Sequence, residues 1–166
     1  LRLIFRTSMD PHKPFGSLGS PEHGQAGRQI GEEGIVLLQN NGNLLPIDLN
    51  KAKKIAVIGE NAIKMMTVGG GSSSLKVKYE ISPLDGLKSR VGSKAEVVYA
   101  RGYVGDPTGE YNGVKTGQDL KDNRSEDELL AEALQVAKDA DYVVFFGGLN
   151  KSNHQDCEDS DRASLG

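Results

Sequence analysis

The residues best suited to chemistry lie close together near the end of the sequence. One histidine and four carboxylates fall within eight residues: His154, Asp156, Glu158, Asp159 and Asp161. They follow an apolar run, Tyr142 to Phe146, which is typical of a fully buried strand. Loops that leave the carboxyl ends of parallel strands are where α/β proteins place ligands and reactive groups. Carboxylates in such a loop are suited to proton transfer.

The same residues allow other interpretations. His154, Asp156 and Glu158 could bind a divalent cation, but their spacing is not that of a helical ligand pair and lacks the pattern of a calcium loop, so we expect no metal. An acidic loop that is merely solvated stays open on the residues alone. The adjacent Asp161 and Arg162 are most simply a local charge pair that orders the loop.

Composition excludes several classes of protein. The chain has 166 residues, of which 37% are hydrophobic, enough for one domain with a core and an appended arm. A net charge of −3 argues against binding to nucleic acid. The single cysteine, Cys157, excludes an internal disulfide. No apolar run approaches the ~20 residues that span a bilayer, so we expect no membrane insertion.

Strand and helix patterns alternate along the chain. Apolar runs predict strands at residues 54–59, 96–100 and 141–147, and helix signals predict helices over about 21–39 and from Ser82 and Ser125 onward. Residues 104–124 show no periodicity and predict an exposed excursion. The strands are apolar throughout, which favours a mostly parallel sheet covered by helices on both faces, an α/β fold.

Two of these helices carry an apolar stripe that we expect to face the core. In the helix that begins at Ser82, the inward positions are Leu84, Leu87 and Val91. In the helix that begins at Ser125, the stripe is predicted at Leu130, Ala133, Leu134 and Ala137.

Glycines after the strands do not support a nucleotide site. Gly59 is followed by Glu-Asn-Ala, so neither the dinucleotide fingerprint nor a phosphate-binding loop is present. The loop Gly69-Gly70-Gly71 is either a flexible turn or a backbone that lines a pocket. We therefore expect no cofactor.

Five segments, in this order, resemble family 3 glycoside hydrolases, and most closely their bacterial β-glucosidase branch. They are GEEGIVLLQNNGNLLPI (31–47), KIAVIGENA (54–62), GGGSSS (69–74), ISPLDGLKSRVG (81–92) and GLNKSNHQDCEDSDRASLG (148–166). The resemblance covers nearly the whole chain. It implies a three-layer, flavodoxin-like α/β sandwich truncated at its C-terminal side, with residues 1–20 as the end of a barrel domain and linker and residues 21–166 as the first part of the sandwich domain.

The resemblance also implies roles for the acidic loop. The family's acid followed by Asp-Arg matches Glu158 with Asp161-Arg162, although Asp159 stands where many relatives have glycine. Glu158 is then the general acid/base of a retaining, exo-acting β-glucosidase, and the pKa of its carboxyl should lie above the ~4.3 of free glutamate. His154, Asp156, Asp161 and Arg162 are implied as substrate-binding or loop-ordering residues.

Further expectations follow from the same resemblance. The substrate is a β-glucoside or oligosaccharide, and the partner is the barrel domain of the same parent chain, which carries the aspartate nucleophile. The parent protein would be periplasmic or secreted, and this fragment alone would be inactive because it lacks the nucleophile. The alternative is a non-catalytic α/β module that binds a sugar or a nucleotide.

Overall fold

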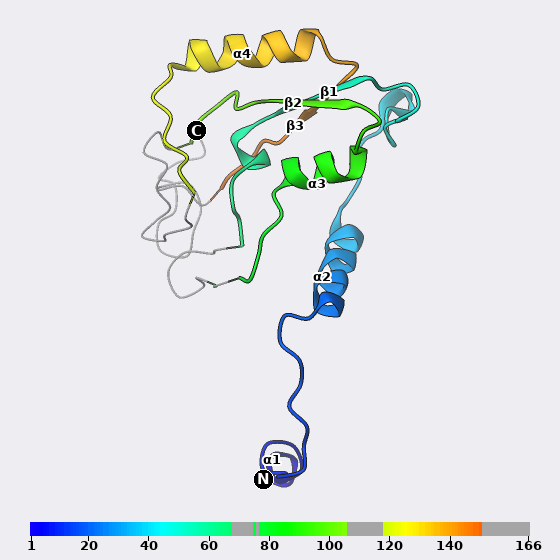
Figure 1. Cartoon of the computed structure of the whole chain (residues 1–166), viewed down its shortest axis with the longest axis vertical. Helices are drawn as coiled ribbons and strands as arrows, with labels where there is room; N and C mark the ends of the chain where they lie inside the picture. Colours follow the sequence, from blue (N-terminus) through cyan, green and yellow to red (C-terminus); the bar gives the residue numbers. More distant parts are fainter. Residues whose placement is uncertain (68–74, 76, 106–117, 151–166) are drawn as a thin grey trace. The chain divides into compact units, whose positions relative to one another are not determined.

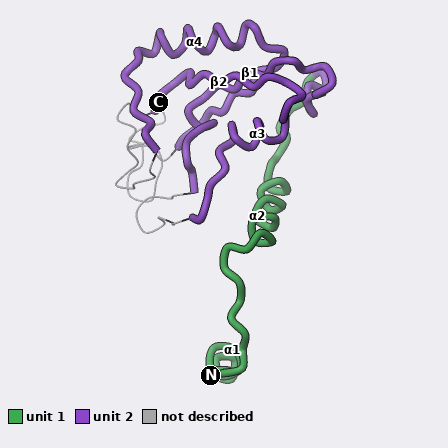
Figure 2. Tube along the Cα trace, viewed as in Figure 1, with its two compact units in different colours: residues 1–41 green, residues 42–166 purple. Residues whose placement is uncertain are grey.

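The computed structural model describes residues 1–67, 75, 77–105 and 118–150. The chain divides into two compact units, residues 1–41 and 42–166 (Figure 2). The smaller unit contains helices α1 (Arg2–Thr7) and α2 (Pro21–Gly34), neither of which has a buried residue.

Helix α2 begins where the sequence predicts and ends earlier. Ser20 is its N-cap and Pro21 its first residue, as expected. The predicted end near residue 39 is wrong, because the helix stops at Gly34 and Ile35 is extended (φ −76°, ψ 127°). Glycine is a poor helix former, and the β-branched Ile35 and Val36 that follow favour extended backbone.

The larger unit is built on a three-stranded parallel sheet in the order β2-β1-β3 (Figure 1). The strands are β1 (Lys54–Ile58), β2 (Glu96–Ala100) and β3 (Tyr142–Phe145). β1 is central, and its Ile55 lies opposite Val97 of β2 and Tyr142 of β3. Short 3-10 turns lie at Asn41–Asn43 (η1) and, directly after β1, at Glu60–Ala62 (η2). The predicted parallel α/β sheet is confirmed.

Helices α3 (Pro83–Val91) and α4 (Glu126–Lys138) cover opposite faces of this sheet (Figure 1). Val57 packs with Leu84 of α3, whereas the next residue, Ile58, packs with Ala133 of α4. Successive side chains of a strand point to opposite faces, so the two contacts place one helix on each side. The result is three layers, α3, sheet and α4.

Both helices begin at the predicted serines. The Ser82 hydroxyl accepts a hydrogen bond from the Asp85 N–H (3.1 Å), and Ser125 with Glu128 forms the expected capping box. In α3 the expected inward residues are confirmed, since Leu84 and Val91 are buried and Leu87 packs against them.

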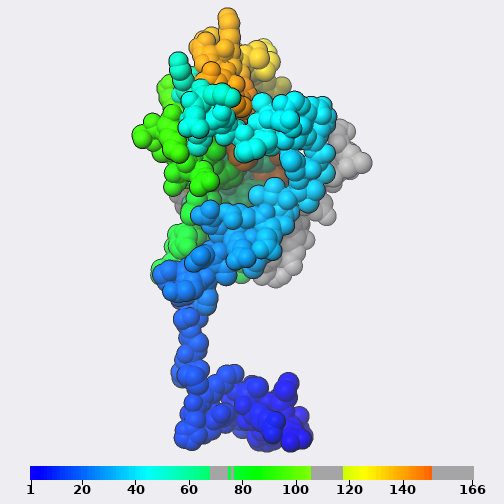
Figure 3. Space-filling view, turned by 90° about the vertical axis from the view of Figure 1, so that its right-hand side faces the viewer, coloured from blue at the N-terminus to red at the C-terminus, as the bar shows by residue number. Residues whose placement is uncertain are grey.

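The predicted core-facing stripe of α4 is confirmed at Ala133 and Ala137 and is wrong at Leu130 and Leu134. The buried residues are Leu129 and Ala133, whereas Leu130 and Leu134 are 53% and 61% exposed. Residues of α4, yellow to orange, lie at the surface of the larger unit (Figure 3). Leu129, which the predicted stripe left out, lies four residues before Ala133 and so on the same face of the helix, and Ala133 packs on Ile58 and Ala100.

Strand β3 is less buried than its apolar sequence predicts. Val143 is 48% exposed and Phe145 is 62% exposed, whereas Tyr142 and Val144 are half-buried and pack on the core. Along β3 the side chains alternate between half-buried and exposed, so one face of this edge strand is covered and the other is not. The expectation of a fully buried strand is therefore wrong for β3 and right for β1.

A group of charged side chains ties the segment before α4 to the end of β2. Asp122 Oδ2 lies 3.3 Å from Arg101 Nη1 and 2.7 Å from Arg124 Nη2. Arg124 Nη1 also reaches Glu132 on α4, at 2.8 Å. The hydrogen bonds from Arg124 hold the pKa of the Asp122 carboxyl well below its usual range.

Replacing Ile55 by Ala tests the central strand. Ile55 is completely buried, and loss of a buried isoleucine side chain costs about 2–5 kcal/mol because a cavity remains. We expect the free energy of unfolding, measured by urea denaturation, to fall by that amount. Val143→Ala on the exposed face of β3 is the control, and an equal loss in both variants would contradict the assigned core.

Replacing Asp122 by Asn tests the charged group. The pKa of Asp122 is lower in the folded protein than the ~3.9 of an unfolded chain, so its stabilising effect is fully present above that pH and is lost as the pH falls below it. We expect Asp122→Asn to lose about 1–3 kcal/mol of unfolding free energy at neutral pH. The difference from the parent should narrow below about pH 4.

The exposed Asp119, in the same segment, supplies the control for that experiment. Asp119→Asn should change the unfolding free energy far less at either pH. A stability gap for Asp122→Asn that is the same in acid as at neutral pH would show that the carboxylate charge is not what stabilises the segment.

Candidate active-site segment at the carboxyl edge of the sheet

The predicted site residues all lie outside the part of the chain that the structure describes. They are His154, Asp156, Glu158, Asp161 and Arg162, and the glycine loop at 69–74 shares this position. Their roles therefore stay predictions. The structure does describe residues 146–150, which lead from β3 toward them, and the groups that hold these residues.

Backbone contact joins the ends of β1 and β3. The Phe146 N–H donates to the Ile58 carbonyl at 2.8 Å, which extends the pairing beyond β3. Gly59 follows with φ +126°, and a Cβ at this position would collide with the Phe146 carbonyl. A residue without a side chain is therefore required where the two strand ends meet.

Two tyrosines from the end of β2 hydrogen-bond to this junction. The Tyr103 hydroxyl donates to the Phe146 carbonyl at 2.8 Å, and the Tyr99 hydroxyl donates to the Gly59 carbonyl at 3.2 Å. Burial raises the pKa of both phenols above their usual value, so both remain protonated donors at neutral pH. The ring of Tyr103 also lies beside that of Phe145, with 6.0 Å between centroids.

Asn61, in η2, contacts the same residues from the end of β1. Its Nδ2 donates to the Gly148 carbonyl at 3.0 Å, and its Oδ1 accepts from Asn150 Nδ2 at 2.9 Å. Asn150 is only 1% exposed. The nitrogen and the oxygen of the Asn61 carboxamide therefore both hold the residues that follow β3.

Buried charges lie next to Asn61. Glu60 and Lys64 are completely buried and form an ion pair of 2.6 Å. Arg101 Nη2 lies 3.7 Å from the other oxygen of Glu60, and the Gly105 N–H donates to that same oxygen. Charges removed from water require such partners. The group joins the residues after β1 to those after β2.

Two further side chains hold the segment between η2 and the glycine loop. Gln118 accepts from the Met65 N–H and donates to the Ile63 carbonyl, both at 2.8 Å. Glu80 accepts from the Met66 N–H and from the Thr67 hydroxyl. The expected exposed excursion at 104–124 is accordingly wrong near its end, where Leu120 is also buried.

A pattern in the sequence points to these residues. Each polar group lies within five residues of the end of an apolar strand: Glu60 and Asn61 follow β1, Arg101 and Tyr103 follow β2, and Asn150 follows β3. Polar residues at that position share one edge of a parallel sheet. The spacing of four between Glu60 and Lys64 also predicts a side-chain pair.

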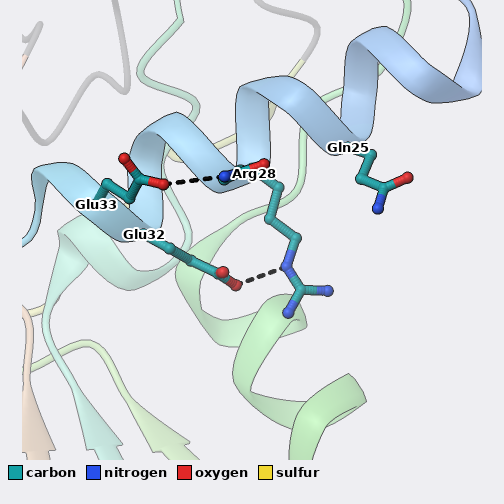
Figure 4. Close-up of a pocket in the computed structure, with 5 residues that line it drawn as sticks. Gln25, Arg28, Glu32 and Glu33 are labelled. Atoms are coloured by element: carbon teal, nitrogen blue, oxygen red, sulfur yellow. Dashed lines mark hydrogen bonds and ion pairs between the residues drawn. The ribbon is translucent and has the colours of Figure 1, made fainter.

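A hollow on the flank of α2 carries no site. It is lined by Gln25, Arg28, Gln29, Glu32 and Glu33, all from this one helix (Figure 4). The hydrogen bonds across it join residues four apart, Arg28 with Glu32 (2.7 Å) and Gln29 with Glu33 (2.9 Å). Exposed pairs of this kind stabilise a helix by a few tenths of a kcal/mol and imply no ligand.

Two kinds of feature are absent from the described residues. No three or more His, Cys, Asp or Glu side chains gather there in an arrangement that could hold a metal ion. Within the same residues, no helix has the length and apolar character needed to cross a membrane.

Comparison with known proteins identifies the family. Residues 35–166 match the glycosyl hydrolase family 3 C-terminal domain. The chain is 45% identical over 170 aligned residues to the β-glucosidase BoGH3A of Bacteroides ovatus, which covers 99% of this chain and 22% of that protein. It is 35% identical over 154 residues to a β-xylosidase of Formosa agariphila, covering 89% of this chain and 18% of that protein.

Solved structures agree with this assignment. A GH3 β-glucosidase from Bifidobacterium adolescentis superposes with a TM-score of 0.71 at 31% identity, covering 99% of this chain and 21% of that one. The chain thus spans about a fifth of the length of these relatives. Their likeness also confirms the predicted parallel sheet with flanking helices as the α/β sandwich of this family. By family match, sequence identity and fold, the chain belongs to glycoside hydrolase family 3.

Proposed function

We propose that this chain is the acid/base-bearing segment of a retaining, exo-acting β-glycosidase whose substrates are terminal β-glucosides. Glu158 is the proposed general acid/base. One observation carries the proposal: 45% identity to a β-glucosidase across 99% of the chain, including the predicted acidic loop. The strand that leads to this loop is also held firmly at its carboxyl end by neighbouring polar residues.

The proposed reaction has two steps. In the first, the Glu158 carboxyl gives its proton to the glycosidic oxygen while the bond from that oxygen to the sugar breaks and the sugar bonds to a carboxylate nucleophile. In the second, the Glu158 carboxylate takes a proton from water, whose oxygen displaces the nucleophile from the sugar. We propose that the nucleophile is an aspartate of a barrel domain in the full-length protein.

The remaining predicted residues have supporting roles in this proposal. His154 and Asp156 contact the sugar or order the loop, and the Asp161-Arg162 pair orders it. Residues 1–20 are the end of the barrel domain and the linker, and residues 21–166 are the first part of the sandwich domain. The full-length protein is exported to the periplasm or the medium.

We propose a preference for glucosides over xylosides because of sequence similarity. The β-glucosidase relative is more similar than the β-xylosidase relative, and its alignment covers more of the chain. Most sugar contacts would come from the barrel, however, so an aryl β-xyloside belongs in every assay beside the aryl β-glucoside. A higher kcat/KM for the xyloside would reverse the proposed preference while leaving the role of Glu158 intact.

Replacement of Glu158 in the full-length enzyme tests the acid/base assignment. Positioned proton transfer contributes about 10²–10⁴-fold. We expect Glu158→Ala to lower kcat/KM by that factor for an alkyl or phenyl β-glucoside, whose leaving group needs a proton. The loss should be far smaller for dinitrophenyl β-glucoside, whose leaving group does not. Azide should restore turnover of the activated substrate and give β-glucosyl azide.

Asp159→Asn is the matched control, since it removes an adjacent carboxylate and leaves the proposed acid in place. It should hydrolyse the unactivated glucoside without azide. If Glu158→Ala hydrolyses that substrate at the parent rate, the assignment is wrong. A full-length protein that binds glucose by calorimetry and hydrolyses neither substrate would support the alternative of a binding module.

A further inference from the structure

Asn61 is placed to fix the direction in which the chain leaves β3. It lies in η2, three residues after Ile58, which pairs with Phe145 of β3. Its carboxamide bonds to residues 87 and 89 positions away in sequence, Gly148 and Asn150. Both of its hydrogen-bonding atoms are therefore used on the same short stretch of chain.

The backbone of Asn61 is itself held. Its N–H lies 3.4 Å from the Tyr103 hydroxyl, which donates to the Phe146 carbonyl. The backbone at residue 60 is fixed as well, because the Glu60 carboxylate is paired with the buried Lys64. Because its backbone is held in place, the Asn61 side chain can restrain the residues to which it hydrogen-bonds.

The residues that Asn61 binds need such a restraint. Gly147 and Gly148 follow β3, and Gly148 has φ +115°, a backbone conformation open to glycine and strained for other residues. Two consecutive glycines have many accessible conformations, so on their own they leave the exit from β3 poorly defined. The hydrogen bond to the Gly148 carbonyl and the contact with buried Asn150 select one of them.

We propose that Asn61 is a positioning residue for the general acid/base of this enzyme. The inference rests on the proposed role of Glu158, which follows Asn150 by eight residues (158 − 150). Asn61 does not donate the proton. It anchors the base of the segment that carries the donor, and misplacement of a reacting group by about 1 Å can lower a rate by as much as 10²-fold.

The test compares substrates in the full-length enzyme. Asn61→Ala should lower kcat/KM for an unactivated alkyl or phenyl β-glucoside by about 10–100-fold and should lower it much less for dinitrophenyl β-glucoside. Azide should partly restore its turnover of the activated substrate. The exposed Asn123 supplies the control, because Asn123→Ala removes the same amide elsewhere in the larger unit and should change neither rate.

A double-mutant cycle identifies the contact. Asn150→Ala removes the other amide of the pair and should reproduce the same dependence on the leaving group. Since the two side chains share one hydrogen bond, the double variant should be less impaired than the product of the two single losses predicts. Rates are counted per active site titrated with a fluoroglucoside inactivator, so a fraction of unfolded enzyme does not enter the comparison.

The outcomes separate this inference from the proposed function. If Glu158→Ala shows no dependence on the leaving group, the acid/base assignment fails. If Glu158→Ala shows it and Asn61→Ala slows both substrates equally per active site, the acid/base stands and Asn61 is only a structural residue. Fully multiplicative losses in the Asn61 and Asn150 variants would also overturn the shared anchor.

Discussion

The structure of the larger unit depends on one constraint, the parallel pairing of β1 with a strand on each side. Ile55, Ala56 and Val57 are completely buried because they are covered by helices on both faces and by strands on both edges. Parallel strands place their carboxyl ends at the same edge of a sheet. This pairing alone brings together residues near 60, near 102 and near 148, which are far apart in sequence.

Buried charge is concentrated at that edge, and stability is a poor explanation for it. Taking an ion pair such as Glu60–Lys64 out of water costs about as much as the attraction returns. Arg101 is less well satisfied, since its Nε and Nη2 are buried without a hydrogen bond to any residue that the structure describes. The group does restrict the local conformation, because a buried carboxylate with two cationic partners and a backbone N–H donor can be satisfied in few arrangements. It thereby fixes the turn on which Asn61 sits.

The fold was predictable to the extent that local rules decide it. Apolar runs located all three described strands, and serine caps located the starts of α2, α3 and α4, because these signals act between neighbouring residues. The end of α2, the two leucines of the predicted α4 stripe and the exposure of β3 were predicted wrongly. The end of α2 has a local cause that the prediction missed, because Gly34 and the β-branched Ile35 and Val36 disfavour helix. The inward face of α4 and the exposure of β3 depend instead on which surface the element meets, and that is decided by packing.

The candidate site likewise contains residues that the sequence points to and one whose role only the structure reveals. Acidic residues at 154–161 attract attention through composition and through resemblance to a family, and their placement lies outside the described residues. Asn61 carries only the weaker signal of a polar residue that follows a strand, and such an asparagine is most simply a turn residue. Its importance comes from a carboxamide that meets Gly148 and Asn150 across 87 and 89 positions of sequence.

The glycines at this edge show why a polar anchor is needed there. Gly59 must lack a side chain because the Phe146 carbonyl occupies the space, and Gly148 adopts a positive φ. The close approach of the two backbones thus requires glycine, and glycine also increases the number of conformations open to the chain. The hydrogen bonds from Tyr103 and Asn61 oppose that loosening at the carbonyls of residues 146 and 148. In the proposed enzyme, where a carboxyl on this segment must meet a nucleophile from another domain, the accuracy of that meeting is set first at these two carbonyls.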